Sequence, residues 1–183
     1  MSQAFVSPLL DIKAFAKAES TLSGRDALAK FERLREETQA QDEEPQVEWQ
    51  ARGEWHVDAG GQEAIWLHLN VRVNLLQICQ RCMGGADIPV AVDRSFRFVA
   101  TEEMAQAQDD ESDEDVLVLS REFDLAALIE DELLLAMPLV PLHERCPTEI
   151  KLSAEDTDFE APSGQKPNPF AVLARLKSGK SGT

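Results

Sequence analysis

Three cysteines and one histidine of this 183-residue chain have the spacing of a metal site. Cys79 and Cys82 form a C-x2-C pair, and His143 and Cys146 form an H-x2-C pair much further along the chain. Each pair can turn two ligands toward one ion, and a Cys3His set closes the tetrahedral coordination of structural Zn²⁺. The alternative is that Cys79 and Cys82 are ordinary buried thiols near a turn and His143 is a surface residue. Spacing alone leaves both interpretations open.

Other chemistry at these residues is less well supported. An odd number of cysteines at close spacing suits reduced thiols or a metal better than the disulfide framework of a secreted protein. A thioredoxin-like C-x-x-C opens a helix, whereas Gly84-Gly85 and a strand pattern follow here. The chain also has no nucleophile elbow, P-loop or H-E-x-x-H motif. We therefore predict a protein that is not an enzyme.

The compartment follows from targeting and hydropathy signals. The first ten residues have neither a basic region nor a long apolar run, so no signal peptide is expected. The longest apolar run covers residues 133–142 and includes two prolines, whereas a bilayer span needs about 20 residues. The sequence predicts a cytoplasmic protein with no membrane partner.

The elements that must position the candidate ligands are mostly strands. Residues 47–57, 65–75 and 88–98 alternate apolar with polar positions, and 116–119 is a fourth apolar run. A period of two is typical of strands with one buried face, and short turns between them favour antiparallel pairing. The prediction is an α+β fold built on an antiparallel β-meander of about four strands, flanked by helices.

Helical patterns lie on either side of these strands. Residues 8–17 and 26–39 place apolar side chains about one turn apart, with a break at residues 21–24. Asp124 is a good N-cap for a helix that Pro138 ends, and its apolar stripe is expected to cover the sheet.

The domain organisation predicted from these patterns has three parts. Residues 1–46 form an N-terminal helical segment packing on the core. Residues 47–150 form the β-rich core with its covering helix and an acidic loop at 102–115. Residues 151–183 form a flexible C-terminal tail with a short helix at 169–177, which a Pro at the first helical position favours.

Net charge is −16, and half of that excess lies in residues 102–115, which hold eight acidic and no basic residues. Such a stretch buries little apolar surface and repels itself, so a disordered loop is expected. One interpretation is a solubilising insertion between two strands. The other is an acidic finger that holds a basic protein or competes with RNA.

The polar face of the predicted sheet carries a candidate RNA-binding group of Arg52, Trp66, Arg72 and Arg97. Arginines can bind phosphates while a tryptophan stacks on a base. Several acidic residues share this face, so the alternative is an ordinary mixed solvated surface, covered by the N-terminal helices.

The basic tail provides a second candidate surface. Its short helix offers partner-docking residues Asn168, Phe170, Leu173 and Leu176. The alternative is that these apolar side chains dock on the protein's own body.

Three stretches together resemble the YceD family, the large ribosomal RNA subunit accumulation proteins. They are LQICQRCMG within residues 75–84, LIEDELLLAMPLVPLHERC at 128–146 and QKPNPFAVLARLK at 165–177. The resemblance implies a small bacterial cytosolic protein needed for normal accumulation or processing of 23S ribosomal RNA, encoded beside a large-subunit ribosomal protein. The family's cysteines match Cys79, Cys82 and Cys146, whereas some relatives carry a cysteine near the position of His143.

The resemblance has to be reconciled with the charge, because RNA affinity depends heavily on neutralising phosphates. The predicted function is a non-enzymatic factor for 23S rRNA accumulation that binds a large-subunit ribosomal protein or assembly factor through its acidic surface. The alternative is direct local rRNA binding by the sheet arginines or the basic tail. A processing enzyme is the weakest hypothesis, because no catalytic constellation is visible.

Overall fold

A five-stranded β-sheet is the centre of the computed structural model, which describes residues 9–57, 61, 63–109, 114–148 and 170. The strands lie in sequence order across the sheet: β1 (Thr21–Ala27), β2 (Gln46–Val57), β3 (Glu63–Ile78), β4 (Gly85–Val99) and β5 (Asp115–Val118). The α+β class is confirmed. The expected antiparallel meander of about four strands is wrong in two respects, because β1 is a fifth strand and β5 runs parallel to β4.

The parallel pairing has its origin in the segment between β4 and β5, where a disordered acidic loop was expected. Part of that segment is a helix, α3 (Glu102–Asp109), whereas residues 110–113 lie outside the described residues. Parallel neighbours need a crossover of about a dozen residues or more, and this connection supplies one. The sheet is therefore mixed.

Local interactions explain why acidic residues form α3. The Thr101 hydroxyl accepts from the Met104 backbone N–H at 3.3 Å, and Ala105 packs against Val99 and Val116. Glu102 and Glu103 occupy the first turn. The positive end of the helix dipole favours carboxylates there, so these two charges stabilise the helix. The acidic composition of the segment had instead indicated a disordered loop.

The N-terminal segment is also less helical than expected. The first helix, α1 (Ile12–Lys17), lies within the predicted range 8–17, but residues 21–27 pair with β2 as strand β1. The helix expected at 26–39 is therefore wrong in its bounds. Gly24 lies opposite Trp49, and a Cβ at Gly24 would stand 2.6 Å from the indole. The Trp49 indole N–H in turn donates to Asp26 at 2.7 Å. This pairing with a distant strand overrides the local helical pattern.

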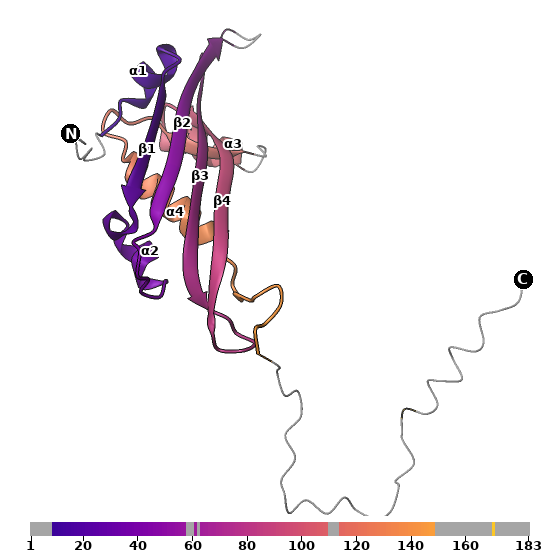
Figure 1. Ribbon diagram of the computed structural model, residues 1–183. Helices are drawn as coiled ribbons and strands as arrows, with labels where there is room; N and C mark the ends of the chain where they lie inside the picture. Colours follow the sequence, from indigo (N-terminus) through magenta and orange to yellow (C-terminus); the bar gives the residue numbers. More distant parts are fainter. Residues whose placement is uncertain (1–8, 58–60, 62, 110–113, 149–169, 171–183) are drawn as a thin grey trace, which may run out of the picture. The chain divides into compact units, whose positions relative to one another are not determined.

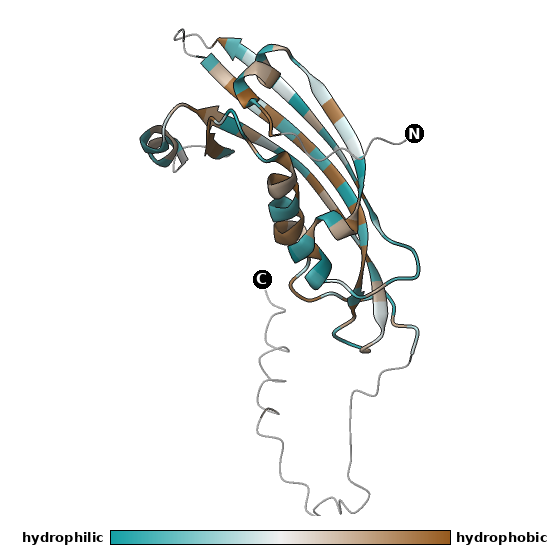
Figure 2. Cartoon of the chain, turned by 90° about the vertical axis from the view of Figure 1, so that its left-hand side faces the viewer, coloured by the Kyte–Doolittle hydropathy of each residue, from teal (hydrophilic) through white to brown (hydrophobic). Residues whose placement is uncertain are grey.

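The remaining helices of the described residues cover one face of the sheet. They are α1, α2 (Glu32–Glu36), which follows a 3₁₀ turn at Leu28–Lys30, and α4 (Leu125–Ala136), seen behind the strands in Figure 1. Their buried side chains join the inward residues of β2, β3 and β4 in a single core. Hydrophobic and hydrophilic residues alternate along the strands (Figure 2), as the period of two predicts. No helix among the described residues is long and apolar enough to cross a membrane.

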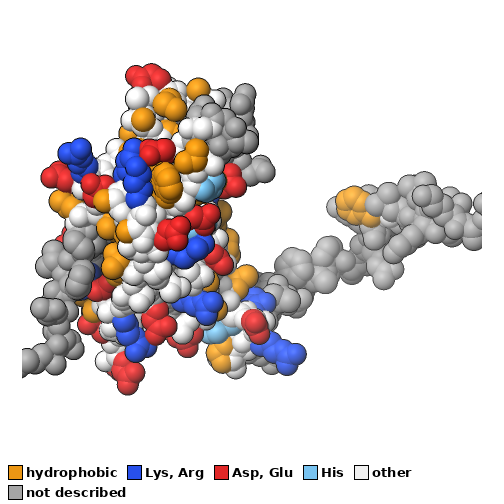
Figure 3. Space-filling model, turned by 90° about the horizontal axis from the view of Figure 1, so that it is seen from above, with side chains coloured by type: hydrophobic (Ala, Val, Ile, Leu, Met, Phe, Trp, Pro, Cys, Tyr) orange, Lys and Arg blue, Asp and Glu red, His pale blue; other side chains and the backbone are white. Residues whose placement is uncertain are grey.

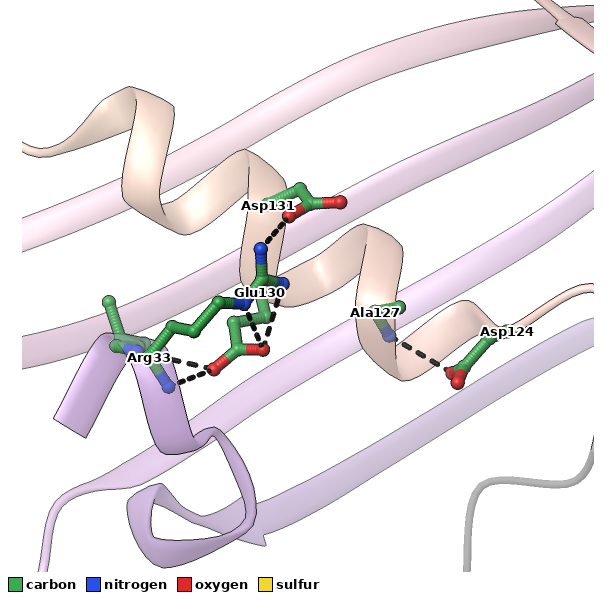
Figure 4. A network of polar contacts seen from close by, with 6 residues as sticks. Arg33, Asp124, Ala127, Glu130 and Asp131 are labelled. Atoms are coloured by element: carbon green, nitrogen blue, oxygen red, sulfur yellow. Dashed lines mark hydrogen bonds and ion pairs between the residues drawn. The ribbon is translucent and has the colours of Figure 1, made fainter. Parts of the chain in front are cut away.

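Helix α4 begins as predicted and also caps another helix. Its Asp124 side chain accepts from the Ala127 backbone N–H at 3.0 Å (Figure 4). Helix α2 has no N-cap side chain of its own, and the Glu130 carboxylate takes that role from α4. Glu130 accepts from the backbone N–H groups of Arg33 at 2.8 Å and Leu34 at 3.2 Å, and from the Arg33 guanidinium at 2.9 Å (Figure 4).

Glu130→Ala is expected to lower the free energy of unfolding by about 2 kcal/mol, because a cap and a charge-assisted hydrogen bond are lost together. Asp131→Ala is the matched control, since Asp131 is half-exposed and makes only an ion pair to the same Arg33. Its effect should be below about 0.5 kcal/mol. Urea denaturation of the two variants measures both values, and equal losses would contradict the capping role.

Apart from Phe170, the predicted C-terminal helix at 169–177 lies outside the described residues, and so do Asn168, Leu173 and Leu176. Residues 149–183 form a unit separate from residues 1–148. Phe170 is the one described residue of that unit and is largely exposed. Its docking role stays a prediction.

Candidate metal centre

The first ligand pair lies in the turn between β3 and β4. Cys79 follows the last residue of β3, and its backbone N–H donates to the Gly84 carbonyl at 2.8 Å. The Met83 N–H donates to the Cys79 carbonyl, also at 2.8 Å, and Met83 has a φ of 60°. This tight turn brings the Cys79 and Cys82 side chains to the same side. Cys79 is fully buried, as the inward parity of β3 dictates.

The second pair arrives on the segment after α4. Pro138 follows the helix, and the Pro141 carbonyl accepts from the Gln80 backbone N–H at 2.9 Å. This hydrogen bond fixes the segment against the β3–β4 turn two residues before His143. The chain then turns once more and presents Cys146, which is half-buried.

The four side chains meet with the dimensions of a tetrahedral site. Their ligand atoms all lie within 4.8 Å of one another. The sulfurs of Cys79 and Cys146 are 3.8 Å apart, and the Cys82 sulfur is 3.3 Å from Nδ1 of His143. A tetrahedron with metal–sulfur bonds of about 2.3 Å has edges of about 3.8 Å. The donor set and its spacing therefore fit Zn²⁺, and the structure brings together all four residues that the sequence pointed to.

Surrounding groups orient these ligands. Nε2 of His143 lies 2.8 Å from the Gly85 carbonyl, which leaves Nδ1 free to bind a metal. Arg81, between the two cysteines, donates to the Cys146 sulfur at 3.1 Å and to the His143 carbonyl at 2.8 Å. Arg81 was not among the residues predicted from the sequence, although its place inside the C-x2-C pair was a usable signal.

The thiols are not equivalent. Burial opposes ionisation of Cys79, but hydrogen bonds from the backbone N–H groups of His143, Cys82 and Arg81 outweigh it and lower the pKa of Cys79 to about 5. At Cys82 a backbone hydrogen bond from Gly84 favours the thiolate, yet burial and the other two sulfurs raise its pKa. Metals bind thiolates, so these N–H groups favour the form of Cys79 that binds a metal.

Arg81→Ala is expected to weaken zinc affinity by about 10- to 100-fold, the usual cost of losing an outer-shell partner. The hydrogen bond of Arg81 to the Cys146 sulfur also raises the pKa of Arg81, which indicates mutual stabilisation of the two charges. Arg145→Ala is the matched control, because Arg145 is exposed in the same loop and has no hydrogen-bond partner among the described residues. Competition with a zinc chelator gives both affinities, and equal losses would contradict a specific role for Arg81.

The candidate RNA-binding residues lie together on the face opposite the helices, called here the open face. In register, Arg52 is opposite His68, and Trp66 is opposite Arg97. The N-terminal helices pack on the other face, so they do not cover this one as the alternative supposed. Within the described residues, only α3 reaches it, at its β4–β5 end.

Charges on the open face are only partly paired. Arg52 forms an ion pair with Glu54 at 3.1 Å, and His68 lies 2.9 Å from the same carboxylate. Arg72 and Arg97 have no ion-pair partner among the described residues. Acidic and basic side chains also stand side by side on the end of the molecule that Figure 3 shows from above. The open face is therefore mixed in charge, with two arginines available.

Comparison with known proteins identifies the relatives of this chain. Residues 67–177 match the family described as "Large ribosomal RNA subunit accumulation protein YceD". The chain belongs to the YceD family. The protein of that name from Haemophilus influenzae is 49% identical over 61 residues, which make up 31% of this chain and 33% of the relative. The alignment thus spans about a third of that relative. No solved structure matches.

The YceD match contains all four candidate metal ligands and Arg81. It also contains Arg72 and Arg97 of the open face, but Arg52 and Trp66 precede it. The part of the chain that carries the family resemblance therefore includes most of β3, all of β4 and α4, and the candidate metal centre, whereas α1, β1, α2 and β2 lie outside it.

Proposed function

We propose that this protein is a non-enzymatic factor that supports accumulation of 23S rRNA during large ribosomal subunit biogenesis in the cytoplasm. The observation that carries the proposal is the YceD match over residues 67–177. The metal centre supports the non-enzymatic part. A Cys3His set would fill all four tetrahedral positions of a bound zinc ion, whereas catalytic zinc keeps one position open for water or substrate.

Zinc is the ion that this centre is proposed to hold, in a structural role. When bound, it joins two segments through coordination bonds without redox chemistry. Cys79 and Cys82 belong to the β3–β4 turn, and His143 and Cys146 belong to the segment after α4. The centre would thereby hold the residues that follow α4 against the end of the sheet.

A large-subunit ribosomal protein or an assembly factor is the proposed partner. The net charge of −16 favours a basic partner, because complementary charge speeds association and fixes orientation. Ribosomal assembly offers many such chains, which carry the positive charge that neutralises rRNA.

Depletion of this protein should lower the ratio of 23S to 16S rRNA, since the proposed role concerns the large subunit alone. The measurement is quantitative RNA analysis in the host bacterium, with the wild-type chain restored from a plasmid as the control. A normal ratio in cells that lack the protein would contradict the proposal.

Direct local contact with rRNA is the second candidate, and the unpaired Arg72 and Arg97 on the open face favour it. If they bind phosphates, Arg72→Ala with Arg97→Ala should reduce the salt slope of RNA binding by about 1.4 for single-stranded RNA. Arg121→Ala, an exposed arginine off the sheet, is the control. A wild-type slope near zero would exclude this contact.

A further inference from the structure

A groove opens beside the metal centre, where the ends of three elements meet. Its walls are the end of α2 with Glu36 and Glu37, the end of β3 with Gln77, and the segment that follows α4. It has a volume of about 450 Å³. None of the sequence-predicted binding residues lies in it.

The rim of this groove exposes apolar side chains that are not packed in the hydrophobic core. Leu139 lines the groove and is 100% exposed, and the next residue, Val140, is 57% exposed. Single exposed apolar residues are ordinary, but two adjacent ones at the edge of a groove indicate a contact surface. Leu134, Met137 and Pro141 continue the apolar lining inward.

The floor of the groove holds a polar side chain at an inward strand position. Gln77 lies on the same face of β3 as the core residues Val73 and Leu75, and its side chain is buried, with 8% of its surface exposed. Its Nε2 makes only long contacts, 3.5 Å to the Glu37 carbonyl and 3.6 Å to the Met137 sulfur. Its Oε1 has no hydrogen-bond partner within the described residues. A buried acceptor of this kind is rare and gains from a donor that a ligand supplies.

The charge of the lining selects the partner. Two exposed carboxylates, Glu36 and Glu37, line the groove, and no Lys or Arg does. Apolar walls with acidic groups at one side complement a chain segment in which an apolar residue stands beside a lysine or arginine. A donor from that segment would also satisfy Gln77.

The rim is held in place before any partner arrives. The Gln80 N–H fixes the Pro141 carbonyl at 2.9 Å, and the metal ligand His143 follows two residues later. Pro138 and Pro141 further restrict the backbone between them. A surface ordered in advance loses less entropy on binding.

We infer that this groove binds an extended segment of a basic protein, with an apolar side chain between Leu139 and Met137 and a lysine or arginine beside Glu36 and Glu37. The inference rests on the proposed function, in which the partner is a basic ribosomal protein or assembly factor, and it names the surface involved.

The test uses the full chain and three short synthetic peptides. Lysine alternates with leucine in the first peptide, lysine alternates with serine in the second, and glutamate alternates with leucine in the third. At physiological ionic strength, fluorescence polarisation should show the lysine–leucine peptide binding at least about tenfold more tightly than the other two. Equal binding of the lysine–serine peptide would overturn the inference, because charge alone would then suffice. Absence of binding to the lysine–leucine peptide would overturn it as well.

Two variants locate the binding. The double variant Leu139→Ser and Val140→Ser removes the apolar side chains of the rim. The double variant Glu36→Lys and Glu37→Lys reverses the charge of the groove lining. Each double variant should weaken binding of the lysine–leucine peptide by about tenfold or more. These residues are exposed, so the melting temperatures should stay close to that of the wild type. Val57→Ser, at the far end of β2 and 52% exposed, is the control and should bind normally. Unchanged binding in both double variants would overturn the inference.

A photo-crosslinker at position 139 extends the test to cells, with one at position 57 as the control. The inference is supported if the crosslinker at 139, but not the one at 57, captures a segment that combines apolar and basic residues. This capture should be lost in the variant with Glu36→Lys and Glu37→Lys. Capture of RNA, of a second copy of this chain or of an acidic segment overturns it.

Complementation separates the two proposals. If cells that lack the protein keep a normal ratio of 23S to 16S rRNA, the proposed function fails while the peptide result stands. If Leu139→Ser with Val140→Ser restores the ratio as fully as the wild type does, the groove is not the partner site while the proposed function stands.

Discussion

Cys79→Ser is expected to abolish stoichiometric zinc binding and to cause one of the largest losses of stability from a single substitution in this chain. A site filled at 1,000 times its Kd contributes about 4 kcal/mol to the folded state. At roughly 2–4 °C per kcal/mol, the melting temperature should fall by about 10 °C. Cys79 is the most buried of the ligands, and its thiolate is prepared by three backbone N–H groups. Elemental analysis and calorimetry of the purified full chain measure the two effects.

A chelator provides the matched control for this prediction. It should lower the melting temperature of the wild type by a similar amount and leave Cys79→Ser unchanged, because the variant has no metal to lose. Wild-type protein that contains no zinc and melts at the same temperature as the variant would contradict a structural metal.

Gly53→Val is expected to lower the free energy of unfolding by about 3 kcal/mol, at the upper end of overpacking effects. A Cβ at Gly53 would stand 2.8 Å from Cα of Ala16 and 2.9 Å from the carbonyl oxygen of Phe15. Backbone atoms cannot rotate away as a side chain does, so α1 would have to move off the sheet. Denaturant unfolding measures the loss.

His56→Val controls for the introduced residue, because it places the same side chain on the same strand at an exposed position. Its effect should be within about 0.5 kcal/mol. If Gly53→Val lowers the free energy of unfolding no more than His56→Val does, α1 does not pack against β2 at Gly53 as described.

Several features could be predicted because their signals are local. Alternation of apolar and polar residues marks β2, β3 and β4, since a period of two needs only neighbouring residues. The cap of α4 is likewise local, because Asp124 binds the N–H of Ala127 three residues later. The two ligand pairs were visible for the same reason.

What the sequence determined by itself was the family, the long strands, α4 and the identity of the four candidate ligands. Only the tertiary structure decided that β1 joins the sheet, that Glu130 caps α2, that Arg81 orients Cys146 and that Gln77 lies unpaired in a groove. Glu130 and Arg33 are 97 residues apart, and Arg81 and Cys146 are 65 apart. Such contacts depend on which faces meet after chain folding, and no local pattern records that geometry.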